Sequence, residues 1–241
     1  MLTHEQLIVL LAQADTAWRS VRAVARQWQR HDLVTAAFHQ RAAALAADAR
    51  TAMYSLRVEG VEPDPIIELV LAVMADQHGR RRRADVLSRR GDSWPFDSLV
   101  VDGDSFWARA GDAVQSNNGD PSSGHGGADI VRLLMPSAVP GGFDLAVTSE
   151  EEVVAERRCA VVRASPRPYR LPTFGRMPGS EAFHMIAGGT DFRLSVDLVT
   201  GVLLRVVKFV AGETAEVCEF THVSFDEVLD DALFAPLITS P

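Results

Sequence analysis

The sequence is poor in cysteine, the residue on which thiol catalysis, redox chemistry and many zinc sites depend. It has two cysteines in 241 residues, Cys159 and Cys218, and their wide separation excludes the C-x-x-C spacing of zinc and redox motifs. Each lies in a run typical of a strand, so two buried free thiols are the favoured interpretation. A single disulfide formed in an oxidising compartment is the alternative. We expect no metal ion and no cofactor.

Paired histidines and the common catalytic motifs are also missing. None of the seven histidines lies three or four residues from another, the spacing that would place two metal ligands on one helix face. The chain contains no G-x-S-x-G elbow, P-loop, G-x-G-x-x-G or H-E-x-x-H motif. The loop DPSSGHGG has the residue types of a nucleophile relay, which are Asp120, Ser122, Ser123 and His125. Because relay members normally converge from rigid elements, we expect a protein that is not an enzyme.

Long hydrophobic runs are absent as well. The run LIVLLA at 7–12 has no Lys or Arg before it, and Asp15, Trp18 and Arg19 follow it closely. It therefore lacks the basic start and the small-residue cleavage site of a secretory signal. No stretch approaches the roughly 20 apolar residues of a membrane-spanning helix. We expect no membrane span and a cytoplasmic location.

Positive charge is scarce except in one segment. The net charge of −8, with 47% apolar and 23% charged residues, is typical of a soluble globular protein and argues against nucleic-acid binding. The exception is GRRRRADVLSRR at 79–90, where a strand would place Arg81 and Arg83 on one face. Arg80 and Arg82 would then lie on the other face. The favoured interpretation is a solvated strand end whose arginines pair with carboxylates. A peripheral contact of the segment Arg80 to Arg90 with anionic head groups or an acidic partner is the alternative.

The N-terminal part of the chain has a helical period. Thr3 and Gln6 have the spacing of a capping box. The pattern predicts a helix over 3–30, because apolar residues recur at steps of three and four: Leu7, Leu11, Ala14, Trp18, Val21, Ala25 and Trp28. A second, alanine-rich helix is predicted over 33–50. Both apolar stripes fit burial against a sheet, and helices that line a ligand cavity would use the same residues.

From residue 51 onward the pattern changes to strands. Alternation and turn signals predict strands at 53–58, 66–75, 83–90, 98–109, 111–117, 143–148, 152–157, 158–164, 191–199, 202–210 and 214–223. Asp102-Gly103 predicts a hairpin turn within the fourth of these. DIVRLLMP at 129–136 predicts a short helix capped by Asp129 and ended by Pro136, and SEEEV at 149–153 fits a solvated turn. Strands do not alternate with helices, so a parallel sheet is disfavoured and one domain over 1–241 is expected.

The closing strands have a recognisable order of turns. They run through Asp197, Thr200-Gly201, Leu203 to Val207, Ala211-Gly212-Glu213, Glu219 to Phe225 and Asp231-Ala232-Leu233-Phe234. This pattern resembles the last hairpins of the LolA/LolB-like lipoprotein-carrier superfamily. Upstream, RRRADVLSRR and SLVVDGDSFW look like the strands and the Asp-Gly hairpin of the same superfamily. The similarity covers about residues 50–235 and would make this chain a divergent, cytoplasmic, bacterial member.

The resemblance implies an α+β fold with an unclosed (half) β-barrel. A strongly curved antiparallel sheet of about ten strands would occupy 51–235. The helical segment 1–50 and the short mid-chain helix would cover its concave face. In that superfamily the inner apolar residues enclose a pocket for acyl chains. The charged residues Arg193, Arg205 and Lys208 would point outward from the sheet.

Two functions from different classes fit this sequence. The first is a non-catalytic binding protein whose half-barrel cavity holds a lipid, an acyl chain or another hydrophobic small molecule. The candidate ligand contacts, chosen for apolar size and position, are Leu11, Trp18, Phe106, Trp107, Phe192, Leu194, Val206 and Phe209. The second is a protein-interaction or regulatory sensor domain whose cavity is plugged by its own helices and whose partner is another protein.

Overall fold

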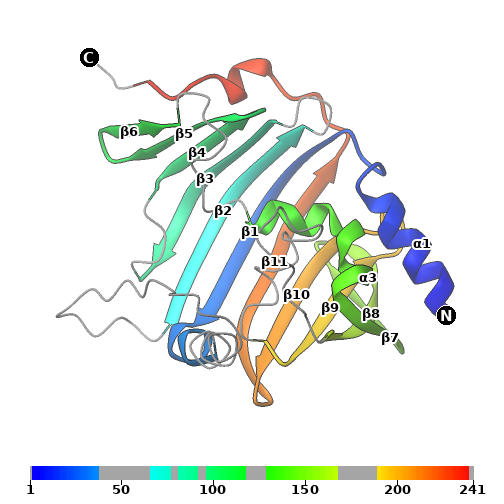
Figure 1. Ribbon diagram of the computed structural model, residues 1–241. Coiled ribbons are helices and arrows are strands. Elements are labelled where there is room, and N and C mark those ends of the chain that lie inside the picture. The colour runs from blue at the N-terminus through cyan, green and yellow to red at the C-terminus, as the bar shows by residue number, and fades with distance from the viewer. Residues whose placement is uncertain are drawn as a thin grey trace, which may run out of the picture.

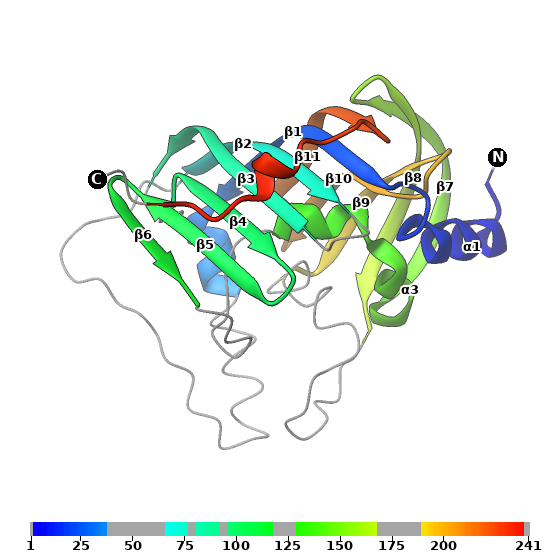
Figure 2. The ribbon, with the colours of Figure 1, turned by 90° about the horizontal axis from the view of Figure 1, so that it is seen from above.

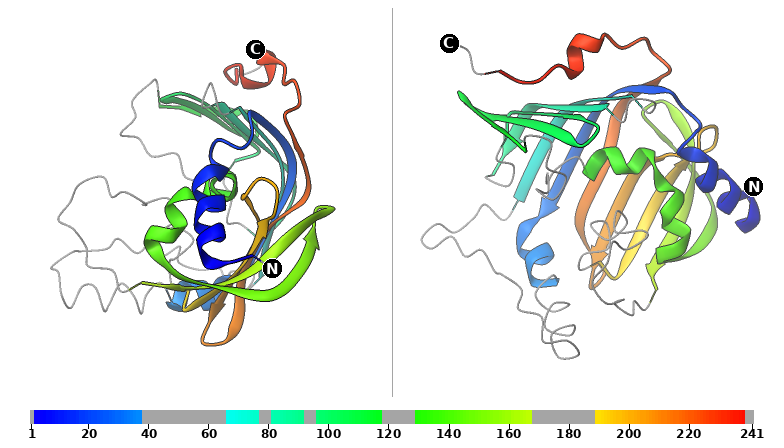
Figure 3. Two further views of the ribbon diagram at one scale, coloured as in Figure 1. Left: turned by 90° about the vertical axis from the view of Figure 1, so that its right-hand side faces the viewer. Right: turned by 45° about the horizontal axis from the view of Figure 1, so that its top comes forward.

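A single curved antiparallel sheet dominates the computed structural model, which describes residues 2–37, 66–76, 81–91, 96–117, 129–167 and 189–238. The sheet has 11 strands in the order β6-β5-β4-β3-β2-β1-β11-β10-β9-β8-β7, and its two edge strands, β6 and β7, do not pair with each other. Figure 1 shows the strands side by side, and Figure 3 shows the curvature of the sheet with helices on its concave side. The expected α+β fold with an unclosed half-barrel is confirmed.

The strands have between 4 and 13 residues. They are β1 Ser20–Arg30, β2 Ile66–Asp76, β3 Arg81–Arg90, β4 Ser98–Asp102, β5 Ser105–Ala110, β6 Ala113–Ser116, β7 Phe143–Val154, β8 Arg157–Pro166, β9 Asp191–Asp197, β10 Leu203–Val210 and β11 Glu213–Phe225. The helices are α1 His4–Ala14, the one-turn α3 Val139–Gly142, and the 3-10 helices η1 Asp129–Leu134, η2 Pro136–Ala138 and η3 Asp231–Phe234. Residues 31–37 are also helical.

The sheet consists of two meanders that meet at its centre. Strands β1 to β6 are neighbours in sequence order, and so are β7 to β11. The meanders are joined by the antiparallel pair of β1 and β11, in which Val21 lies opposite Phe225 and Gln29 lies opposite Glu216. The first and last strands of the fold therefore lie side by side (Figure 1).

The predicted helix over 3–30 is wrong beyond its first half. Helix α1 begins with the expected capping box of Thr3 and Gln6, but it ends at Ala14, and β1 follows. Residues 21–25 also alternate, with Val21, Ala23 and Ala25 buried and Arg22 exposed. Apolar residues at 21 and 25 fit the period of a helix as well as that of a strand. The strand forms because β1 pairs with β2 on one edge and β11 on the other, which satisfies its backbone hydrogen bonds on both edges.

Other predicted elements are largely observed, with changes at their boundaries. The Asp102-Gly103 hairpin is confirmed, since Asp102 pairs with Ser105 and Gly103 has φ +57°. The expected helix at 129–136 is the 3-10 helix η1, and Pro136 begins η2 rather than ending the structure. The predicted strand 53–58, most of the helix 33–50 and the whole Ser/His loop with His125 lie outside the described residues.

The acidic segment SEEEV is part of a strand and not a solvated turn. Strand β7 is continuous to Val154, and its register with β8 shifts between Val147 and Glu151, which marks a bulge. Beyond the bulge, the Glu152 carboxylate accepts a hydrogen bond from the Ser195 hydroxyl and lies 3.3 Å from the Arg205 guanidinium. Since a bulge bends its strand, the end of β7 can reach across the outer face to residues of β9 and β10.

A chain of ion pairs crosses the outer face of the sheet. Arg26 lies 2.6 Å from Glu68 and 3.3 Å from Glu219, and Arg205 lies 2.7 Å from Glu219 and 3.3 Å from Glu152. These five residues come from β1, β2, β11, β10 and β7. Each pair is partly solvated and contributes little alone, about 1 kcal/mol or less. Together they link β2, β1, β11 and β10, which are successive neighbours in the sheet, to the end of β7.

The main core lies on the concave side, between the sheet and the helices. Leu7, Leu11 and Ala14 of α1 are fully buried in one cluster with residues of η1 and of the strands. The Trp18 indole Nε1 donates a hydrogen bond to the Leu134 carbonyl at 3.2 Å, which ties the start of β1 to η1. At the other end of the chain, η3 contacts β3 and β4, and Figure 2, seen from above, shows it beside these strands.

Helix α1 rests on the turn between β9 and β10. The Asp197 carboxylate, 1% exposed, accepts hydrogen bonds from the backbone N–H and the hydroxyl of Thr200. Gly201 follows with φ +76°, and a Cβ at this position would lie 2.3 Å from the carbonyl oxygen of Leu10. The Thr-Gly pair therefore serves two purposes: it forms the turn and it lets the helix backbone approach.

We predict that Gly201→Ala lowers the free energy of unfolding by more than about 3 kcal/mol, because it combines a left-handed φ with a backbone clash. Gly212→Ala is the matched control. Gly212 has φ +84°, but a Cβ there would have no atom within 4 Å, so its substitution costs only about 1 kcal/mol. Urea denaturation of both variants measures the difference, and equal losses would contradict the close approach of α1.

Both cysteines are free thiols in the structure, so the disulfide alternative is not observed. Cys159 is fully buried in the main core. Burial, and secondarily the nearby Asp197 carboxylate, raises the pKa of the Cys159 thiol from 9.0 to about 12. The native state therefore keeps a proton that the unfolded chain loses above pH 9.

The raised pKa of the Cys159 thiol makes the stability of the protein depend on pH. Because the folded pKa is raised, the contribution of Cys159 is fully present below pH 9 and is lost as the pH rises toward 12. Relative to Cys159→Ala, the wild type should lose about 1.4 kcal/mol of unfolding free energy per pH unit in that interval. Urea denaturation of the two proteins at pH 8, 9 and 10 is the measurement, and parallel pH curves would refute it.

Candidate functional site

The concave face of the sheet is a largely apolar surface. Residues opposite each other in an antiparallel pair share a face, so Ala23 of β1, Val73 of β2 and Val223 of β11 point the same way. The same register places Ala25 with Leu71 and Phe220. These positions and their neighbours belong to the main buried cluster or pack against it. Small side chains alternate with large ones along this floor, so its depth varies.

A pocket of about 230 Å³ opens at one end of this concave face. Its apolar walls come from Trp18, from Val131 of η1, from Met135 and from Ala75 of β2, and Gly103 lies at its edge. Because the indole N–H of Trp18 is already bonded to Leu134, the ring itself is the surface offered to a ligand. The pocket is smaller than a typical small-molecule site of about 300–1,000 Å³.

Charged residues surround the mouth of this pocket. Asp76, Arg81 and Arg82 line it, and Arg81 lies 2.5 Å from Asp76 and 2.6 Å from Asp231. The Arg81 guanidinium also lies 4.8 Å from the centre of the Phe234 ring. The hydrogen bonds to Asp76 and then to Asp231 raise the pKa of Arg81. An apolar floor beneath a charged mouth is suited to an amphipathic molecule.

The basic segment behaves largely as its favoured interpretation predicted. Arg81 and Arg83 lie on one face, where both contact the C-terminal segment: Arg81 reaches Asp231, and Arg83 donates to the Leu233 carbonyl at 3.1 Å. Arg83 also lies 2.7 Å from Asp85. These two arginines thus pair with groups of the chain itself. A peripheral contact of Arg80 to Arg90 with a membrane stays a prediction.

The structure brings most of the predicted ligand contacts to the concave side. Five of them are buried in the main cluster: Leu11, Trp18, Phe192, Leu194 and Val206. Phe106 is buried in a second, smaller cluster with Leu99 and Val101. Trp107 and Phe209 are half-buried. Because side chains alternate along a strand, Trp107 of β5 points to the face opposite Phe106, and Phe209 of β10 points to the face opposite Lys208. Only Trp18 lines the pocket described above, and the role of all eight as ligand contacts stays a prediction.

Lys208 points inward and not outward as expected. It lies opposite Phe192 of β9, a core residue, and it is 2% exposed. Its Nζ lies 3.3 Å from Glu216, whose other carboxylate oxygen accepts a hydrogen bond from Gln27 at 2.8 Å. The concave floor thus contains one buried ion pair. The sequence did indicate this orientation, because Lys208 is two residues from the apolar Val206 and side chains two residues apart on a strand share a face.

Metal-binding clusters and membrane-spanning helices are not found in the parts of the chain that the structure describes. Within those parts no group of three or more His, Cys, Asp or Glu side chains could hold a metal ion. Among the same residues, no helix has the length and apolar character needed to cross a membrane. The candidate site is the concave face with its pocket, an apolar surface with charged residues at its mouth.

Comparison with known proteins adds similarities in structure alone. No family model matches the chain, and no curated protein matches it. The chain is similar to the Mycobacterium tuberculosis lipoprotein LppX (10% identity, TM-score 0.48, 95% of this chain and 99% of that one). It is also similar to a LolA superfamily protein of Nitrosomonas europaea (11% identity, TM-score 0.31, 94% of this chain and 96% of that one). A third similar structure is the Pseudomonas aeruginosa MucA/MucB complex (14% identity, TM-score 0.45, 95% of this chain and 59% of that one). The chain spans 59% of that last chain. One of these structures is thus a LolA superfamily protein, from the superfamily that the closing hairpins resemble.

The buried pair on the concave floor leads to a prediction about stability. Lys208→Met leaves the Glu216 carboxylate without its cation, and we expect a loss of about 3 kcal/mol in unfolding free energy. The double variant Lys208→Met/Glu216→Gln should recover at least about 1 kcal/mol of that loss, because no unpaired charge remains. Arg205→Met, on the solvated outer face, is the control and should cost about 1 kcal/mol or less. Additive losses in the double variant would contradict the pair.

Proposed function

We propose that this protein is a non-catalytic binding protein that holds a hydrophobic or amphipathic small molecule on the concave face of its half-barrel. The observation that carries the proposal is the 230 Å³ pocket, whose apolar walls continue into the concave floor and whose mouth is charged. Burial of an acyl chain on such a surface gains about 0.8 kcal/mol per methylene group. The arginines at the mouth would remain in contact with water and with the polar end of the ligand.

A second candidate is an interaction or sensor domain that keeps its concave face filled by its own side chains. One observation favours it: six of the predicted ligand contacts have exposed fractions of 5% or less, and α1 and η1 pack on the same side. In that case the concave face is core, and the recognition surface lies elsewhere on the molecule. The two candidates differ in whether a ligand can enter, which is measurable.

Entry of a ligand is tested with an uncharged fluorescent probe of apolar surfaces, N-phenyl-1-naphthylamine, and with native mass spectrometry of protein purified without detergent. We expect probe binding to the wild type. Ala75→Leu places a larger side chain against the pocket wall and should weaken probe binding at least tenfold, which is about 1.4 kcal/mol. Val70→Leu, on the same strand and the opposite face, lines neither hollow; it is the matched control and should leave probe binding unchanged.

The outcomes separate the two candidates. Probe binding that Ala75→Leu weakens and Val70→Leu does not supports the concave pocket. Absence of both probe binding and co-purified lipid would favour the self-filled interaction domain. Thermal melting of each variant confirms that the protein is folded in every measurement.

A further inference from the structure

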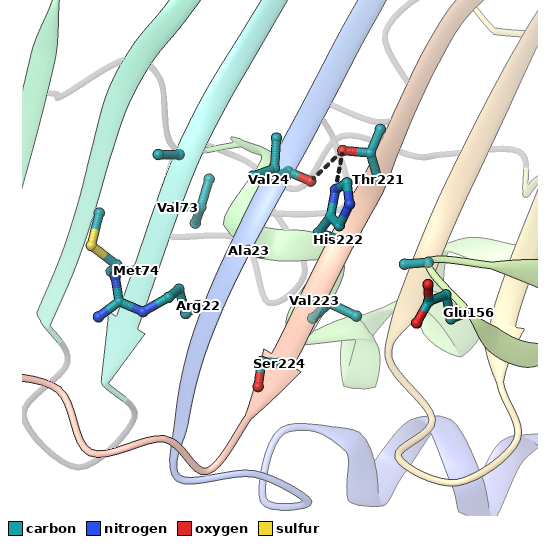
Figure 4. A pocket seen from close by; sticks show the side chains of 12 residues that line it. Arg22, Ala23, Val24, Val73, Met74, Glu156, Thr221, His222, Val223 and Ser224 are labelled. Atoms are coloured by element: carbon teal, nitrogen blue, oxygen red, sulfur yellow. Dashed lines mark hydrogen bonds between the residues drawn. The ribbon is translucent and has the colours of Figure 1, made fainter.

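The outer face of the sheet has a second hollow, larger than the concave pocket. It is a groove of about 560 Å³ formed by β1, β2, β11 and the turn between β7 and β8. Figure 4 shows it with Met74 and Arg22 on one side, Val24, Thr221 and His222 in the middle, and Glu156 across from them. Its volume lies within the range of about 300–1,000 Å³ of small-molecule sites.

The floor of the groove is apolar. Val24, Ala72 and Met74 alternate with the core residues Ala23 and Val73, so their side chains point to the outer face. None of these three side chains carries a charge. A strand face on the outside of a curved sheet is normally open to water, and here it is enclosed on one side by the end of a hairpin.

That hairpin is held firmly in place. Arg157, directly after the turn, lies 2.8 Å from the buried Asp197 carboxylate, and its guanidinium lies 5.0 Å from the centre of the Phe225 ring. Val154, directly before the turn, is buried in the main cluster, and Glu152 is bonded to Ser195. The wall of the groove is therefore anchored on both sides of the turn.

The turn itself has an unusual backbone conformation for its residues. Ala155 and Glu156 have φ of +48° and +63°, a left-handed backbone that glycine or asparagine adopts far more readily. Both positions nevertheless carry a side chain, and both residues line the groove. Strained positions of this kind often coincide with binding sites, because the surrounding structure must hold them.

The charges around the groove do not balance. Arg22 lies 3.1 Å from Glu227, which neutralises it. Within the described part of the chain, Glu156 makes no hydrogen bond and no ion pair. Counting Arg22, Glu227 and Glu156 leaves one negative charge, located opposite an apolar floor. A ligand that matches both features has an apolar body and one positive charge.

We propose that this groove binds a small organic cation, an amine with an apolar body that rests on Val24, Ala72 and Met74 and an ammonium group that pairs with Glu156. The site is separate from the concave pocket and does not depend on the function proposed above. Because Arg22 and His222 also border the groove, a second cation is disfavoured, and one amine per chain is the expected stoichiometry.

Three probes with one shared ring test the proposal: 1-naphthylmethylamine, 1-naphthalenemethanol and 1-naphthoate, titrated calorimetrically against the full chain. We expect the amine to bind at least tenfold more tightly than the alcohol and the carboxylate. Glu156→Gln should reduce amine affinity to that of the alcohol, and Glu151→Gln should not change it. Glu151 is the matched control, because it lies on the same hairpin and is paired with Arg158 at 2.7 Å.

Variants that change volume locate the bound amine. Ala72→Leu should reduce the affinity of the amine at least tenfold, whereas Ala75→Leu should not change it. Equal affinity for amine and alcohol, an unchanged affinity in Glu156→Gln, or loss of amine binding only in Ala75→Leu would each overturn the proposal. If no probe binds and Ala72→Leu abolishes self-association, the groove is an interface for a second copy of the chain, and the proposal is also overturned.

Discussion

The antiparallel pairing of β1 with β11 is the interaction on which the rest of the structure depends. It joins two meanders that are each continuous in sequence, and it brings residues 21–29 against residues 216–225. Closing so long a loop costs conformational entropy that local hairpins do not cost. The pairing gives β1 backbone hydrogen bonds on both edges, and it creates a concave apolar face that extends from one meander to the other. Without this pair, the fold would be two separate sheets.

The curvature of the joined sheet gives its two faces different properties. On the concave side, α1 and η1 pack on the floor, and the Gly201 turn lets α1 approach without a side chain between them. On the outer side, charged residues of five strands pair in a chain that includes Arg26, Glu219 and Arg205. The pocket near Trp18 and the groove near Glu156 therefore lie on opposite faces, and each can be changed without altering the other.

Local signals in the sequence predicted the hairpins well. The Asp102-Gly103 turn and the Thr200-Gly201 turn are both observed, because turn chemistry depends on a few adjacent residues. Two features of the sites were harder to anticipate. Lys208 faces inward, although alternation with Val206 indicated it. The groove near Glu156 could not be predicted, because it requires the hairpin of β7 and β8 to fold over strands that are distant in sequence.

The half-barrel was implied by the resemblance of the closing hairpins to a known superfamily. The sequence by itself determined a chain of antiparallel, valine- and leucine-rich strands with a capped N-terminal helix and without a recognisable catalytic motif. These properties follow from periodicity and turn residues, which act over a few positions. Only the tertiary structure decided that residues 20–30 form a strand, that the SEEEV segment is part of β7, and where the two hollows lie. The physical reason is the same in each case. Backbone pairing and side-chain contacts between distant segments outweigh a local preference that was nearly balanced.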